Sequence, residues 1–145
     1  MPAVTGEEHE QQGVRYVDIR VGTGDTPVTP GRCVFVHYTG WLANGGTLFE
    51  SSRDTVPGTP VRPVGFVQGT RAVIDGWESG VAGMRAGGIR RLYVPQRLAY
   101  GDEGHRPRIP PRSNLVFDLE VVTVTAALRA PRGAQVCPPW TEVGG

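Results

Sequence analysis

The chain has 145 residues, the usual size of one domain, and 21 of them are glycine and 13 are proline. Helices tolerate both residue types poorly, so this composition disfavours a mainly helical protein and favours short strands joined by turns. All 15 basic residues are arginine and 14 residues are acidic. The resulting net charge of +1 lacks the basic excess that is typical of a nucleic-acid-binding domain.

Hydrophobic patterning predicts five or six strands and one helix. After a polar N-terminal arm at 1–13, β-forming residues mark strand candidates at 14–21, 32–38, 47–52, 63–68, 89–94 and 115–124. Before the strand at 89–94, the apolar positions 73, 77, 81 and 84 share one face of a 3.6-residue period, which predicts a helix over 73–84. Consecutive strands with short turns indicate an antiparallel sheet and the α+β class.

Two further segments lie outside these elements. Residues 95–114 form a loop rich in proline, glycine and charge, and loops of this length inside compact domains are usually functional. Residues 125–145 have no hydrophobic period, so we expect a flexible C-terminal tail, although Trp140 could dock on the sheet or on a partner.

The chemistry-bearing residues exclude several classes of site. Cys33 and Cys137 show no CxxC spacing, which predicts two unpaired thiols in a reducing compartment. The N-terminus lacks an apolar signal core, and no apolar run is long enough for a membrane span, so we expect a cytoplasmic protein. His9, His37 and His105 are far apart, and no cofactor motif occurs, so we expect neither a metal nor a cofactor.

Aromatic residues stand near strand ends, in the helix and beside the long loop, at Tyr38, Phe49, Phe66, Trp77, Tyr100 and Phe117. Taken one by one, they fit the core of a small domain. Taken together, they also fit an aromatic-lined apolar pocket at one end of the sheet, covered by the loop at 95–114.

Six short motifs occur in order within residues 14–124: Val36-His37-Tyr38-Thr39-Gly40, Phe49-Glu50-Ser51-Ser52-Arg53, Val73-Ile74-x-Gly76-Trp77, Ala99-Tyr100-Gly101, Ile109-Pro110-Pro111 and Leu115-Val116-Phe117. This series resembles the FKBP family of peptidyl-prolyl cis-trans isomerases, the receptors of immunosuppressive macrolides. The resemblance implies a twisted antiparallel sheet of five or six strands wrapped on one short helix.

The resemblance also implies a set of site residues. The catalytic group would be Tyr38, Phe49, Glu50, Trp77, Tyr100 and Phe117, with Trp77 as the floor of the pocket. The substrate-binding group would be Val64, Val73, Ile74, His105 and Ile109. The backbone N–H of Ile74 would bind a ligand carbonyl, and the hydroxyl of Tyr100 would donate a second hydrogen bond to the ligand. The expected partners are proline-containing polypeptides and macrolides, with no nucleic acid and no membrane, and the expected state is a monomer.

Four departures from the family pattern leave two functions open. Glu50 stands where the family has aspartate, Val64 where it has an aromatic residue, and Arg108 where an apolar residue is common. An apparent insertion occupies 55–62. These changes favour a module that binds proline-containing partners or macrolides with little turnover. An isomerase of X-Pro bonds, which is the function we expect, is favoured by the intact residues at the other site positions: Trp77, Ile74, Tyr100 and Phe117.

Overall fold

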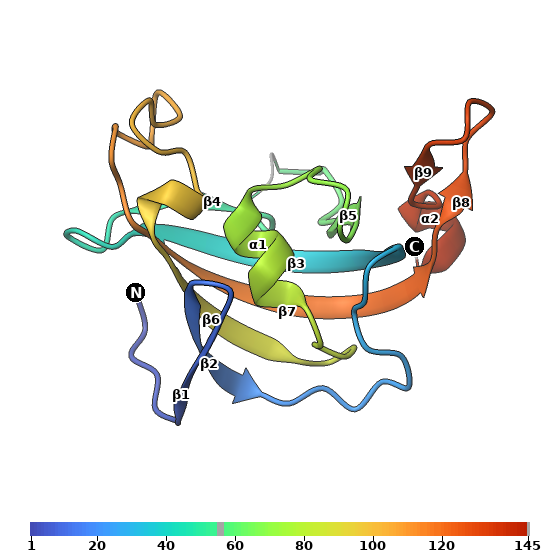
Figure 1. Cartoon of the computed structure of the whole chain (residues 1–145), viewed down its shortest axis with the longest axis horizontal. Coiled ribbons are helices and arrows are strands. Elements are labelled where there is room, and N and C mark those ends of the chain that lie inside the picture. The colour runs from blue at the N-terminus through green and yellow to red at the C-terminus, as the bar shows by residue number, and fades with distance from the viewer. Residues whose placement is uncertain (55–56, 145) are drawn as a thin grey trace.

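The computed structural model describes residues 1–54 and 57–144 and contains a seven-stranded antiparallel sheet with helix α1 packed across one face (Figure 1). The elements of this domain are β1 Glu8–Gln11, β2 Val14–Arg20, β3 Arg32–Leu42, β4 Leu48–Ser51, β5 Val64–Val67, α1 Asp75–Val81, β6 Ile89–Val94, the 3-10 helix η1 Gln96–Leu98 and β7 Leu115–Ala126. The strand order is β1-β2-β6-β7-β3-β4, and β5 pairs with β3.

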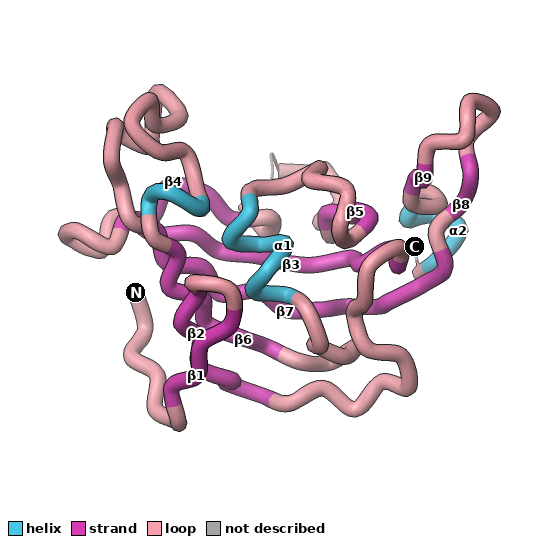
Figure 2. Tube along the Cα trace, viewed as in Figure 1, coloured by secondary structure: helices cyan, strands magenta, loops and turns pink. Residues whose placement is uncertain are grey.

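The C-terminal segment adds a second, two-stranded sheet and a short helix. These elements are β8 Leu128–Arg129, β9 Gln135–Val136 and α2 Trp140–Val143. Figure 2 shows that they rise at one end of the main sheet, whereas the loop at 95–114 rises at the opposite end. No helix of the described chain is long and apolar enough to cross a membrane.

Helix α1 lies close to the sheet, because two of its glycines face β6. A Cβ atom at Gly80 would stand 2.5 Å from Leu92 Cδ1, and one at Gly76 would clash with Val94. Trp77 and Val81 point from the same helix into the core, where their neighbours include Phe117. The glycines therefore lower the intrinsic stability of the helix but allow the close packing that holds it.

The α+β class and the antiparallel sheet with one main helix are confirmed. The helix is shorter than the predicted 73–84, and β1 lies within the segment expected as a polar arm. Part of the apparent insertion at 55–62 falls on positions 55 and 56, which lie outside the described residues. The division into arm, domain and tail stays a prediction.

The prediction of two unpaired thiols is wrong. Cys33 on β3 and Cys137 in the C-terminal segment form a disulfide, with a Cα–Cα distance of 5.4 Å. Trp140 follows this link and lies against Phe35 of β3, with ring centroids 5.3 Å apart. The two cysteines are 104 positions apart, so no local spacing could reveal that the sheet brings them together.

Candidate active site

A pocket of about 210 Å³ opens between α1, β3, β4, β7 and the two loops that precede α1 and follow β6. Its lining is mainly aromatic and aliphatic: Tyr38, Phe49, Glu50, Ala72, Val73, Ile74, Trp77, Tyr100 and Phe117. A larger hollow of about 290 Å³ beside Arg15 and Arg97 has charged groups in its wall and lacks this aromatic enclosure. The aromatic pocket is therefore the candidate site for an apolar ligand group.

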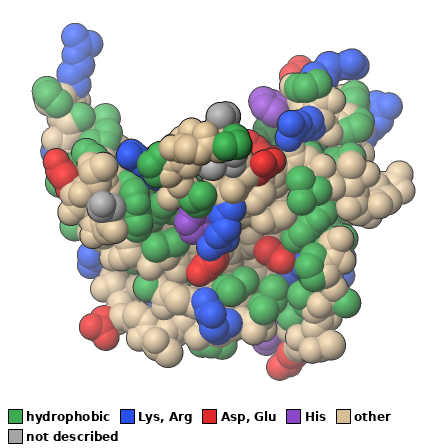
Figure 3. Space-filling view, turned by 180° about the vertical axis from the view of Figure 1, so that it is seen from behind, with side chains coloured by type: hydrophobic (Ala, Val, Ile, Leu, Met, Phe, Trp, Pro, Cys, Tyr) green, Lys and Arg blue, Asp and Glu red, His purple; other side chains and the backbone are tan. Residues whose placement is uncertain are grey.

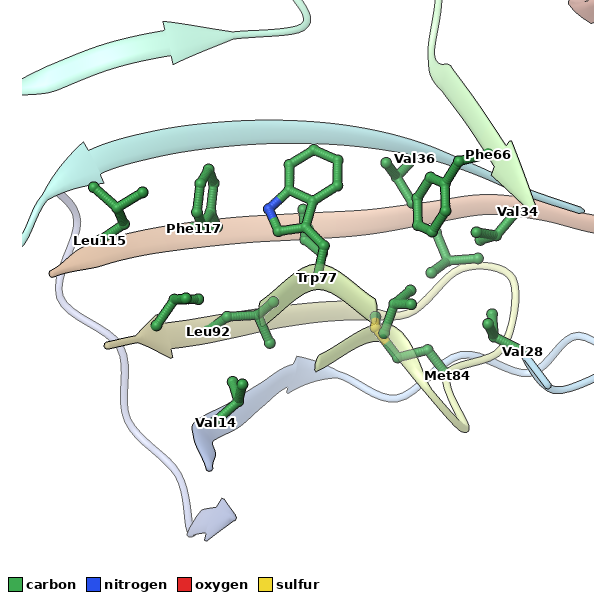
Figure 4. Close-up of a cluster of buried hydrophobic side chains, with 14 of the residues drawn as sticks. Val14, Val28, Val34, Val36, Phe66, Trp77, Met84, Leu92, Leu115 and Phe117 are labelled. Atoms are coloured by element: carbon green, nitrogen blue, oxygen red, sulfur yellow. The ribbon is translucent and has the colours of Figure 1, made fainter. Parts of the chain in front are cut away.

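The floor of the pocket is an interlocked set of rings around Trp77. Tyr38 lies 4.9 Å and Phe117 lies 5.4 Å from Trp77 between ring centroids, both edge-to-face, and Phe49 meets Phe117 at 88°. Figure 4 shows the Trp77 indole nitrogen on the side of Phe117. This buried N–H has no conventional partner in the described chain, and the face of Phe117 offers it an N–H···π contact.

A glycine in β3 makes room for these rings. The register pairs Gly40 with Phe117 of β7, so both residues present the same face of the sheet. A Cβ atom at Gly40 would lie 2.5 Å from Phe49 Cζ and 2.9 Å from Phe117 Cε1. The missing side chain therefore allows both phenylalanines to reach the pocket.

Two tyrosine hydroxyls and one carboxylate supply the polar part of the wall. Burial raises the pKa of Tyr38, and the Glu50 carboxylate raises it further through its charge and a hydrogen bond. Burial and the same carboxylate also raise the pKa of Tyr100. Both phenols thus stay protonated at neutral pH and can donate hydrogen bonds, for example to a carbonyl oxygen.

The helix holds the loop that forms one side of the pocket. Glu78 on α1 accepts hydrogen bonds from the backbone N–H groups of Gly69 and Arg71, at 2.7 and 3.2 Å, through the same carboxylate oxygen. The chain then leads directly into Ala72, Val73 and Ile74. The Ile74 carbonyl accepts a hydrogen bond from the backbone N–H of Trp77 at 3.0 Å, so this wall and the floor are joined at the start of α1.

The loop at 95–114 forms the opposite side and is tied at several points. His105 stacks on Tyr100 with ring centroids 4.7 Å apart, and its backbone pairs with that of Ile109 in both directions. Arg108 reaches back to β4, where its Nη1 donates to the Phe49 carbonyl at 2.6 Å. These contacts place Tyr100 over the mouth of the pocket.

Of the site residues expected from the sequence, eight line the pocket: Tyr38, Phe49, Glu50, Val73, Ile74, Trp77, Tyr100 and Phe117. His105 supports Tyr100 from outside, and Ile109 is buried in the core beside the pocket. Val64 is exposed on β5 and is absent from the lining. Ala72 lines the pocket although nothing in its sequence context singles it out.

Fold and site together define a small α+β domain with a preformed, aromatic ligand pocket. A family model described as FKBP-type peptidyl-prolyl cis-trans isomerase matches residues 24–122. The chain belongs to this family.

Individual relatives agree with this assignment. The isomerase Fkbp12 of Drosophila melanogaster is 43% identical over 112 residues, which cover 77% of this chain and 98% of that protein. The isomerase FPR2 of Saccharomyces cerevisiae is 48% identical over 98 residues, with coverage of 68% and 69%. The N-terminal domain of FKBP42 from Arabidopsis thaliana superimposes with a TM-score of 0.73 at 28% identity, with coverage of 86% and 96%.

Some relatives are much longer than this chain. The matched region spans only 28% of FK506-binding protein 4 and 7% of FK506-binding protein 5 of Dictyostelium discoideum.

Proposed function

We propose that this chain accelerates cis-trans rotation of X-Pro bonds in polypeptides, with the proline ring held over Trp77. The observation that carries the proposal is a preformed pocket whose floor is aromatic and whose mouth holds two protonated tyrosines. Family membership supports the same activity.

The chemistry of rotation suits such a pocket. Amide resonance opposes rotation with a barrier of ~18–20 kcal/mol, and the planar amide carries the charge separation that water stabilises. An apolar pocket removes that water, so the planar ground state loses more solvation than the twisted transition state does. Lowering the barrier by ~7 kcal/mol would raise the rate by about 10⁵.

The described residues have distinct parts in this mechanism. Phe117, Phe49 and Trp77 enclose the proline ring and exclude water from the amide. The Ile74 N–H donates to a substrate carbonyl, and the Tyr100 hydroxyl donates a second hydrogen bond to the substrate; together they fix its direction while the bond turns. Glu50 orients the Tyr38 hydroxyl, since its carboxylate hydrogen-bonds that phenol.

The ligand class follows from the same pocket. Proline-containing polypeptides are the proposed substrates, and macrolides of the FK506 type are proposed ligands, since relatives carry that ligand in their names. We treat the chain as a monomer.

The disulfide bears on the compartment. The sequence predicts a cytoplasmic protein from its N-terminus and a reducing compartment from two unpaired thiols. A disulfide between Cys33 and Cys137, however, forms and persists in an oxidising compartment. An oxidising location is therefore the better proposal for this chain.

An exchange assay by NMR on a short Ala-Pro peptide tests the activity. We expect catalysed exchange with the parent protein, a loss of several-fold or more in Trp77→Phe, and little change in Trp140→Phe, which removes the same ring area away from the pocket. Exchange no faster than in buffer, together with FK506 binding, would contradict the isomerase and favour the alternative, a binding module with little turnover.

A further inference from the structure

Arg108 places a positive charge at the mouth of the aromatic pocket. Its backbone is adjacent to Ile109, which is buried beside the pocket, and its side chain crosses to β4. There Nη1 donates to the carbonyl of Phe49, a residue of the pocket wall. This hydrogen bond ties the guanidinium to the edge of the pocket, where Arg108 remains exposed to solvent.

The charge of Arg108 is not neutralised by the protein. Its partner is a neutral carbonyl, and in the described part of the chain neither Arg108 nor its loop neighbours Arg106 and Arg112 form an ion pair. Figure 3, in which this loop lies at the upper right, shows several basic side chains there, with acidic and histidine side chains beside them. One hydrogen bond also leaves most of the five guanidinium N–H donors free for a ligand.

Glu50 contributes a second charge to the pocket lining, and it is also exposed. Glu50 acts on the hydroxyls of Tyr38 and Tyr100 and hydrogen-bonds the first of them. Its carboxylate shares the pocket lining with these two phenol donors, whereas the Arg108 guanidinium lies outside the lining and has N–H donors left over. The mouth consequently offers a binding group for a carboxylate on the side of the loop at 95–114.

We infer that Arg108 is a specificity-determining residue that favours substrates with aspartate or glutamate next to the proline. This inference rests on the proposed function of the pocket. The pocket of about 210 Å³ is smaller than the roughly 300–1,000 Å³ of sites for drug-sized ligands, so it holds little more than the proline. The neighbouring residues of the substrate must then lie at the mouth, only ~3.8 Å away along the chain.

The expected preference is modest because the guanidinium is exposed. Exposed ion pairs contribute little, which corresponds to about a twofold to fivefold higher kcat/KM for a Glu-Pro peptide than for the matched Gln-Pro peptide at low salt. The preference should decline as salt is added, since salt screens exposed charges.

The test compares Glu-Pro, Gln-Pro and Lys-Pro peptides with the parent protein, Arg108→Gln, Arg108→Lys and Arg112→Gln. Arg112 is the matched control: it carries the same charge on the same loop but lies in a separate hollow with Leu42 and Asn44. We expect the Glu-Pro to Gln-Pro ratio to fall to about one in Arg108→Gln, to persist in Arg108→Lys, and to be unchanged in Arg112→Gln.

Two readouts separate this inference from the proposed function. Exchange of the neutral Gln-Pro peptide reports the activity itself, and peptide affinity from tryptophan fluorescence reports selectivity even without turnover. Equal ratios in the parent and in Arg108→Gln, by both readouts, would overturn the role of Arg108. Loss of the preference in Arg108→Lys as well would overturn a role based on charge.

Discussion

The imidazole of His37 is a titratable group that is linked through Ser52 to the backbone of Tyr38, a residue of the pocket lining. Its Nδ1 lies 2.9 Å from Ser52 Oγ, and the same oxygen accepts the backbone N–H of Tyr38 at 2.9 Å. Burial lowers the pKa of His37, and the positive charge of Arg53 lowers it further, whereas Glu120 acts in the opposite direction. The folded protein therefore keeps this imidazole neutral to a lower pH than the unfolded chain does.

This difference predicts a loss of stability in mild acid. Below the ordinary histidine pKa of about 6.5 the unfolded chain binds a proton that folded His37 resists, so the free energy of unfolding falls as the pH drops through the lowered folded pKa. Denaturant titrations at pH 7.5 and 5.5 should show a larger decline for the parent than for His37→Gln, in which the other titrating groups remain. An NMR midpoint for His37 at or above the ordinary value would refute this prediction.

At the scale of elements, α1 is held at its C-terminal end by side chains from two strands, β1 and β6. Arg90 of β6 donates through Nη1 to the carbonyls of Gly80 and Ala82, at 2.9 and 3.3 Å, and Gln11 donates to the Ser79 carbonyl. These contacts replace the hydrogen bonds that the last turn of a helix lacks. The position of Trp77 thus depends on side chains far from the pocket.

Replacing Arg90 should destabilise the whole domain. Arg90 is 8% exposed, pairs with Asp18 at 2.8 Å and lies over the Tyr16 ring at 4.0 Å. Arg90→Met should lower the free energy of unfolding by about 2–4 kcal/mol, because charged hydrogen bonds to buried carbonyls are lost. The control Arg15→Met removes an exposed pair with Glu8 and should cost at most about 1 kcal/mol. Equal losses in chemical denaturation would contradict the special role of Arg90.

Local patterns predict elements better than they predict their ends and partners. The apolar period identified the face of α1 that carries Trp77, but α1 ends at Val81 and Gly83 beyond it adopts a φ of 82°. The polar sequence of β1 offers no alternation, so its pairing with β2 was not foreseeable. The resemblance places Val64 in the pocket wall, but in the structure Val64 of β5 pairs with Val36 of β3. No local pattern in the sequence reveals this register.

At the scale of the whole molecule, the C-terminal segment connects distant parts of the chain. Eight of the nine residues that line the pocket could be named in advance, because their motifs are local and ordered. The disulfide could not, because its two cysteines belong to unrelated segments that meet only after β3 has entered the sheet. The contact between Phe35 and Trp140 illustrates the same limit, since the sequence around neither residue indicates that the two rings pack together.

The disulfide should supply a substantial part of the stability. Cross-linking residues 104 positions apart restricts the unfolded chain, and removal of such a link typically costs ~2–5 kcal/mol. Cys137→Ser is the suitable variant, because Cys33 is fully buried and its thiol can remain in an apolar site. Chemical denaturation of this variant, and of the parent protein with reductant, should show the same loss.

Two further measurements locate the effect of this disulfide. Proteolysis between β8 and β9 should accelerate in Cys137→Ser, because Trp140 then loses the tether that keeps it on Phe35. Turnover of proline peptides should change little, since the C-terminal segment and the loop at 95–114 rise at opposite ends of the sheet (Figure 1). Identical denaturation midpoints with and without reductant would show that the link adds no stability, and a large fall in turnover would show that the C-terminal segment acts on the pocket through β3 and β5.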